Sequence, residues 1–134
     1  MALCVIDTDV WSYLYKGSNE ARLYEPHLFG NLLVISFQTQ AELLRGALAA
    51  NWGTRRRQHL ESRMNKYVVE PSSYALSLRW ALAMDSARRN GRPIAAADAW
   101  VAATALHLGV PLITHNRSHF IGVDGLMIIS ESGS

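Results

Sequence analysis

The sequence has few cysteines, no long apolar run and no low-complexity tract. One cysteine, Cys4, builds no disulfide framework, which favours a reducing compartment. The apolar runs are far shorter than the ~20 residues that a membrane-spanning helix needs. No basic segment precedes the first apolar run and no small-residue cleavage site follows it, so a signal peptide is not expected. These absences predict a soluble, cytoplasmic protein without a membrane segment.

Charge is divided unevenly along the chain, although the net charge is only +2. Residues 1–44 hold two bases against five acids, residues 45–92 ten against three, and residues 93–134 one against three. The outer thirds are therefore acidic and the middle third is basic. This asymmetry indicates either a polyanionic partner or a set of solvated helix faces, and charge alone does not choose between them.

The 134 residues, 49% of them apolar, predict one domain over 1–134 that can bury roughly two thirds of its unfolded surface. Short apolar runs without polar alternation are typical of strands covered on both faces of a sheet. Helical periods separate these runs, which predicts a mainly parallel sheet with helices on both faces. The expected strands are 3–7, 32–36, 67–70, 110–114 and 126–130, and the expected helices are 38–50, 54–66, 73–90 and 95–108. In the helix over 38–50, one stripe holds Ala41, Leu44 and Leu48.

The first apolar run ends abruptly in Asp7, Thr8 and Asp9. Asp9 has a structural explanation, because it could cap a helix that begins at Val10. Asp7 has none. Since ligands of open parallel sheets bind outside the carboxyl ends of the strands, Asp7 is expected to face a binding site.

Two further acids are expected near the same sheet edge. Glu42 follows the strand over 32–36, although it could instead be a capping partner of Thr39. Asp98 lies near the start of an alanine-rich helix, where it could simply be a first-turn acid favoured by the helix dipole. That helix is apolar on every side, so an ionised Asp98 needs a partner or a cation.

Three converging carboxylates repel one another unless a positive charge lies among them. No lysine or arginine lies within three residues of Asp7 or Asp98. A divalent metal is therefore the expected counter-charge, and oxygen ligands select a hard ion such as Mg²⁺ or Mn²⁺. Such an ion polarises a phosphoryl oxygen and activates water, which is the chemistry of phosphodiester hydrolysis.

Four segments carry a resemblance to a known family: VIDTDVWSYL, VISFQTQAELLRG, IAAADAWVAATAL and PLITHNRSHF. In this order and spacing they resemble PIN-domain endoribonucleases, especially the small VapC-type toxins of toxin–antitoxin pairs. The resemblance implies a three-layer α/β/α sandwich with four or five mainly parallel strands. It also implies Mg²⁺- or Mn²⁺-dependent cleavage of RNA, a homodimer and a small antitoxin partner. Asp7, Glu42 and Asp98 fall on the family's first three acidic positions.

The fourth acidic position of the family is Asn116 in this chain. An asparagine there supplies a neutral oxygen ligand or holds a metal-bound water, and Asp9 could lend a fourth carboxylate from behind. The catalytic set expected from the resemblance is therefore Asp7, Glu42, Asp98 and Asn116, with the first three as metal ligands. Thr8 and Thr114 are expected hydroxyl neighbours of the substrate, with capping of strand ends as the alternative.

The basic run Arg55, Arg56 and Arg57 is a candidate for phosphate contacts, with a solvated helix face as the alternative. Aromatic side chains could stack on bases, although packing suits most of them: Trp11, Tyr13, Tyr15, Trp52, Trp80 and Trp100. His115 and His119 have a spacing that can bind zinc, but no third ligand stands nearby.

Two other functions stay open. A haloacid-dehalogenase-type phosphatase also carries a strand that ends in D-x-D, as VIDTD does. Such enzymes need a lysine near the phosphoryl group, and this chain has only Lys16 and Lys66. The other alternative is a catalytically weak PIN-like module that binds RNA or protein, against which the three carboxylates argue.

Overall fold

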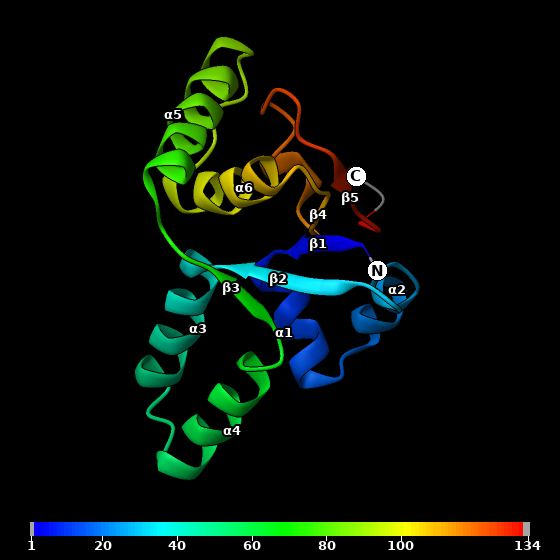
Figure 1. Cartoon of the computed structure of the whole chain (residues 1–134). Coiled ribbons are helices and arrows are strands. Elements are labelled where there is room, and N and C mark those ends of the chain that lie inside the picture. Colours follow the sequence, from blue (N-terminus) through cyan, green and yellow to red (C-terminus); the bar gives the residue numbers. More distant parts are fainter. Residues whose placement is uncertain (1, 133–134) are drawn as a thin grey trace.

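The computed structural model describes residues 2–132, which form a five-stranded sheet in the order β3-β2-β1-β4-β5 (Figure 1). All the strand pairs are parallel, and Val5 in the central strand pairs with both Val34 and Leu112. This confirms the predicted parallel sheet. The strands are β1 (Leu3–Ile6), β2 (Leu32–Ser36), β3 (Val68–Glu70), β4 (Leu112–Ile113) and β5 (Ile128–Ile129).

Helices cover both faces of the sheet, as the α/β/α prediction requires (Figure 1). Two helices cover one face, α5 (Tyr74–Arg89) and α6 (Ala96–Leu108). Four helices lie on the other face, α1 (Thr8–Lys16), α2 (Asn19–Leu28), α3 (Phe37–Ala49) and α4 (Thr54–Met64). Within residues 2–132, no helix has the length and apolar character needed to span a membrane.

The two sides of the sheet are packed with different side chains. On the α6 side the buried residues are mostly small, and Ala99, Ala102, Ala103 and Ala105 are fully buried. Small side chains let α6 lie close against the strands. The side of α1–α4 is packed with large groups instead, among them Trp11, Tyr24, Leu60 and Met64. This side also carries a hollow between α1 and α3.

The strand order changes direction at β1, with β2 on one side of it and β4 on the other. In an open parallel sheet, the crevice outside the carboxyl ends of two such strands is the usual ligand site. Asp7 directly follows β1 and Thr114 directly follows β4. The fold therefore places both residues at this crevice.

Three details differ from the sequence-based predictions. The first helix begins at Thr8 and is capped by Asp7, so Asp9 lies in its first turn instead of capping it. In α3 the buried face holds Thr39 and Ala47, whereas the predicted Ala41, Leu44 and Leu48 stripe is exposed. Helix α2 was not predicted. It contains Pro26, and a proline ordinarily breaks or ends a helix, so the sequence pattern does not indicate one.

Candidate active site

Asp7 lies at the carboxyl end of β1, buried and fixed by hydrogen bonds. Its side chain is only 6% exposed. Its Oδ1 accepts a hydrogen bond from the Thr8 N–H at 2.8 Å, and its Oδ2 accepts one from the Thr114 hydroxyl at 2.8 Å. Thr114 also accepts from the Asn116 N–H at 3.0 Å. The ends of β1 and β4 therefore fix Asp7 in one orientation.

Asp9 joins the start of α1 to the loop that follows β4. Its Oδ1 accepts from the Val10 N–H at 2.6 Å. Its Oδ2 accepts from the His115 N–H at 3.1 Å and from Asn116 Nδ2 at 2.9 Å. Position 116 is where PIN domains usually carry a fourth acid. In this chain it holds an asparagine whose side-chain amide is hydrogen-bonded to Asp9.

Glu42 reaches the edge from α3. Its Oε1 lies 3.4 Å from the Thr8 hydroxyl, which also donates to Thr39 Oγ1 at 3.0 Å. The cap of α3 is Ser36, whose hydroxyl accepts from the Thr39 N–H. Glu42 is therefore not the capping partner of Thr39, and the alternative explanation for this acid is wrong.

Asp98 comes from the first turn of α6, on the opposite side of the sheet from Glu42. Its Oδ2 lies 3.4 Å from His119 Nδ1, in a pair that leaves both side chains partly exposed. The charge of Asp98 raises the pKa values of Asp7, Asp9 and Glu42, so it acts on all three. Asp98 therefore lies near enough to Asp7 and Glu42 to contribute to their raised pKa values.

All four of these carboxyl groups have raised pKa values. Burial and the neighbouring charge of Asp9 raise the pKa of Asp7 to about 7, against the hydrogen bonds from Thr114 and Thr8. Burial is also the largest cause of the raised pKa of Asp9, Glu42 and Asp98. His119 lowers the pKa of Asp98 without cancelling the effect of burial. The edge concentrates negative charge that the protein leaves poorly compensated.

The donor set suits a hard cation because it consists of carboxylate, hydroxyl and amide oxygens. Among residues 2–132, no three His, Cys, Asp or Glu side chains are already gathered closely enough to enclose one metal ion. The acids therefore share an edge without forming a closed cage. The two histidines do not form a zinc site, because His115 Nδ1 is hydrogen-bonded to the Tyr24 hydroxyl and His119 pairs with Asp98.

The candidate substrate residues separate in the structure. Thr8 and Thr114 lie beside the carboxylates, as the hydrogen bonds above require. Arg55 and Arg56 line a hollow of about 700 Å³ next to α1. Arg57 turns to the other side of α4, between α3 and α4. The predicted basic run therefore splits over two faces.

Sequence reasoning assigned no role to Ser36 or Tyr24, paired Thr39 with Glu42 in a helix cap, and considered His119 only as a zinc ligand. Ser36 could have been found, because a serine at the end of a strand and before a helical pattern is a preferred N-cap residue. The pairing of His119 with Asp98 joins residues far apart in the chain, and no local pattern predicts it.

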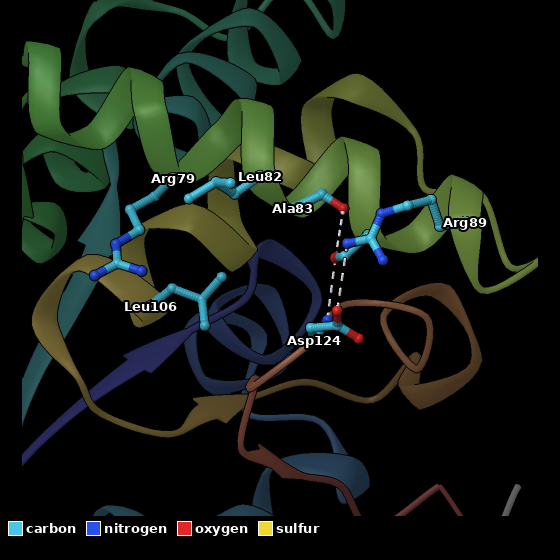
Figure 2. Close-up of a pocket in the computed structure, with 7 residues that line it drawn as sticks. Arg79, Leu82, Ala83, Arg89, Leu106 and Asp124 are labelled. Atoms are coloured by element: carbon cyan, nitrogen blue, oxygen red, sulfur yellow. Dashed lines mark hydrogen bonds and ion pairs between the residues drawn. The ribbon is translucent and has the colours of Figure 1, made fainter.

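Another hollow, of about 220 Å³, lies between α5, α6 and the loop at Asp124 (Figure 2). Its acid and one of its arginines are already paired, with Arg89 Nη2 3.5 Å from Asp124 Oδ2. The Asp124 N–H also donates to the Ser86 hydroxyl at 3.1 Å. We call Asp7, Asp9, Glu42 and Asp98, with the strand ends around them, the carboxylate edge. None of these acids lines the hollow at Asp124, so that hollow lies outside the candidate active site.

Comparison with known proteins decides the family. A model of the PIN domain matches residues 4–126, a span that includes Asp7, Glu42, Asp98 and Asn116. The chain belongs to the PIN-domain family. Ribonuclease VapC1 of Haemophilus influenzae strain R2866 is 33% identical to this PIN domain over 121 residues, covering 87% of this chain and 88% of that protein.

Solved structures agree with this assignment. The structure of VapBC-1 from nontypeable Haemophilus influenzae is 28% identical to this PIN domain, with a TM-score of 0.81 over 96% of this chain and 97% of that one. VapBC-5 from Mycobacterium tuberculosis, a member of the VapBC family of toxin–antitoxin systems, is 26% identical. Its TM-score is 0.70, over 97% of this chain and 99% of that one. The family predicted from the sequence is confirmed, and the phosphatase alternative loses its support.

Proposed function

We propose that this PIN domain is a metal-dependent endoribonuclease that hydrolyses RNA phosphodiester bonds as the toxin of a toxin–antitoxin pair. One observation carries the proposal: four acids lie near one sheet edge, all with raised pKa values, and the only basic side chain paired with any of them among the described residues is that of His119. A divalent cation supplies the missing charge, and Mg²⁺ or Mn²⁺ suits an all-oxygen donor set.

In this proposal Asp7, Glu42 and Asp98 are the metal ligands. When bound, the cation polarises the scissile phosphate and lowers the pKa of an attacking water. Thr114 and Thr8 hold Asp7 and Glu42 in place through the hydrogen bonds described above.

Asn116 has a supporting role. Its Nδ2 is already used by Asp9, so its amide oxygen is the atom left to accept from a water or to meet a cation. Asp9 accepts three hydrogen bonds, and in this proposal it contributes its negative charge without binding the cation directly. The fourth negative charge that the family places at position 116 is thus supplied from position 9.

The names of the relatives support the biological side of the proposal. Ribonuclease VapC1 is named for cleavage of RNA, and the solved relatives VapBC-1 and VapBC-5 carry the name of a toxin–antitoxin pair. We therefore propose RNA as the substrate, a small cognate antitoxin as the protein partner, and a homodimer as the working assembly.

The test is cleavage of a labelled, structured RNA by the purified chain in Mg²⁺, in Mn²⁺ and in EDTA. Cleavage is expected with either metal and not in EDTA. Asp98→Asn should keep the fold and lose more activity than the ~10–100-fold that removal of an outer metal partner costs. A folded chain that cuts no RNA with either metal would favour the binding-module alternative. An Asp98→Asn variant that cuts at the parent rate would show that the site is drawn wrongly.

A further inference from the structure

A hollow of about 320 Å³ leads away from the carboxylate edge between α1 and α3. Thr8 and Glu42 line its inner end, so it opens directly from the proposed active site. Trp11, Tyr15 and Trp52 are among the other residues that line it, and we call this hollow with its three rings the aromatic trough. A polymer bound at the carboxylates can therefore extend along the surface through this trough.

The rings of the trough lie in sequence and nearly parallel. The Trp11 and Tyr15 ring centroids are 5.1 Å apart at 17°, and those of Tyr15 and Trp52 are 6.4 Å apart at 23°. Tyr15 and Trp52 are only half-buried, so part of each ring remains accessible. Stacking on such rings is how proteins bind the bases of single-stranded nucleic acid without strict sequence preference.

Cations surround the outer end of the trough. The Arg56 guanidinium lies 4.0 Å from the centroid of the Trp52 ring, and the Arg63 guanidinium lies 5.5 Å from that of Tyr15. Lys16 lines both the trough and the larger hollow next to it, which Arg55 and Arg56 also line. The middle third of the sequence, which carries the positive charge, therefore supplies a basic border to an aromatic surface. This combination fits phosphate groups beside stacked bases.

One buried polar atom inside the trough has no partner. Trp11 is 2% exposed, and its Nε1–H finds no hydrogen-bond acceptor among the described residues. A buried N–H without an acceptor is costly, so an acceptor brought by a ligand would be bound favourably. The carbonyl oxygens and ring nitrogens of a nucleobase are acceptors of this kind.

We propose that the aromatic trough binds a nucleotide of single-stranded RNA next to the bond that is cut. The base takes the place of the Arg56 guanidinium on the Trp52 ring, an acceptor on its edge meets Trp11 Nε1–H, and Arg56 turns to the RNA backbone. This inference rests on the proposed nuclease function. A polypeptide could also enter an apolar trough, but the basic border and its continuity with the carboxylate edge favour a polyanionic strand.

Two measurements separate this subsite from the active site itself. The first is binding of a labelled single-stranded ten-nucleotide RNA in EDTA, where no cleavage occurs. The second is cleavage in Mg²⁺ of that RNA and of a dinucleotide, which is too short to occupy both the active site and the trough. Trp52→Leu and Arg56→Ala are the test variants. Phe29→Leu and Arg79→Ala are matched controls, because Phe29 is 90% exposed and Arg79 lies on the opposite face.

Trp52→Leu is expected to weaken binding of the ten-nucleotide RNA and to raise its KM by roughly tenfold, the size of one lost base–aromatic stack. Arg56→Ala tests the same subsite with an exposed residue whose loss leaves the fold intact. Cleavage of the dinucleotide should be unchanged in both, as should every reading for the two controls. Trp11→Phe, which removes only the N–H and part of the ring, should weaken binding by a smaller factor.

The outcomes distinguish the two proposals. If the parent chain cuts neither RNA, the nuclease function fails, whereas the binding measurement in EDTA still tests the trough. If the test variants bind the ten-nucleotide RNA as the parent does, the RNA assignment is overturned and the trough is left to a polypeptide. If the dinucleotide and the longer RNA lose cleavage equally, the variants disturb the active site and the subsite proposal is also wrong.

Discussion

Acidic side chains have opposite pKa shifts at the carboxylate edge and at the end of α5. On α5, Asp85 pairs with Arg88 at 2.7 Å and Arg89 at 2.9 Å, and both arginines lower its pKa. At the edge, burial and the neighbouring acids raise the pKa of Asp7, and burial raises the pKa of Asp98 against the lowering effect of His119. Within residues 2–132, two arginines thus pair with the exposed Asp85, and none pairs with Asp7 or Asp98.

This contrast shows what each region is built for. A paired surface acid holds its charge at any physiological pH and needs no ligand. A buried acid that is left without a positive partner makes the empty site less stable, and a bound cation removes that cost. Under the proposed function, the carboxylate edge is therefore less stable in the free protein than with a bound cation.

Replacing Asp7 should give the largest change in this comparison. Its folded-state pKa of about 7 lies above the ordinary aspartate value of 3.8, so folding favours the protonated form. The free energy of unfolding should therefore fall as the pH rises from about 4 through about 7. In EDTA, Asp7→Asn should remove this loss and be more stable than the parent at pH 8 by on the order of 2 kcal/mol or more. Denaturant unfolding at pH 5 and pH 8 measures it.

Mg²⁺ supplies the matched control for that measurement. Millimolar Mg²⁺ should raise the melting temperature of the parent at pH 8 and leave Asp7→Asn almost unchanged, because the variant has lost a ligand. Equal stabilisation of both proteins would mean that Asp7 does not bind the metal. A parent whose stability in EDTA does not decline between pH 5 and pH 8 would mean that Asp7 is not held in its protonated form.

Exchanging the side chains at positions 9 and 116 should give a smaller and reversible effect. Asp9→Asn removes one charge and disturbs the contact with Asn116 Nδ2, so we expect Mg²⁺ affinity to fall by about tenfold. The double variant Asp9→Asn/Asn116→Asp restores the charge and an amide–carboxylate hydrogen bond with reversed polarity. It should recover most of the affinity, as measured by Mg²⁺-dependent melting. Additive losses in the double variant would show that the two positions act independently.

Local patterns were enough to predict most of the fold. The strand over 32–36 has the predicted bounds, and the long helix over 73–90 and the alanine-rich helix over 95–108 differ by a residue or so at their ends. Long periodic segments between Gly, Asn and Pro signal their type strongly. The stripe at Leu44 and Leu48 was misplaced because a helix with apolar residues on several sides does not reveal which side faces the core.

The site was partly predictable, for a physical reason. Parallel strands bring their carboxyl ends to one edge, so Asp7 and Thr114 could be placed together from the strand pattern. The contacts that decide the chemistry join residues that no short pattern links. The Asp9–Asn116 hydrogen bond spans 107 positions, and the Asp98–His119 pair depends on how α6 crosses the sheet. Tertiary packing sets both contacts.

Neutralising Asp85 should have the smallest effect of these changes, and it completes the comparison. Asp85→Asn removes an exposed acid whose two arginine partners lie in the same solvent-exposed helix end. Exposed pairs contribute little, so the melting temperature should move by no more than about 2 °C. Because its pKa is lowered, any loss should be present near neutral pH and vanish as the pH falls below its usual range. The rate of RNA cleavage and the Mg²⁺ affinity measured by Mg²⁺-dependent melting should match those of the parent. A change in either would mean that the end of α5 communicates with the carboxylate edge, and the two regions could no longer be treated as separate.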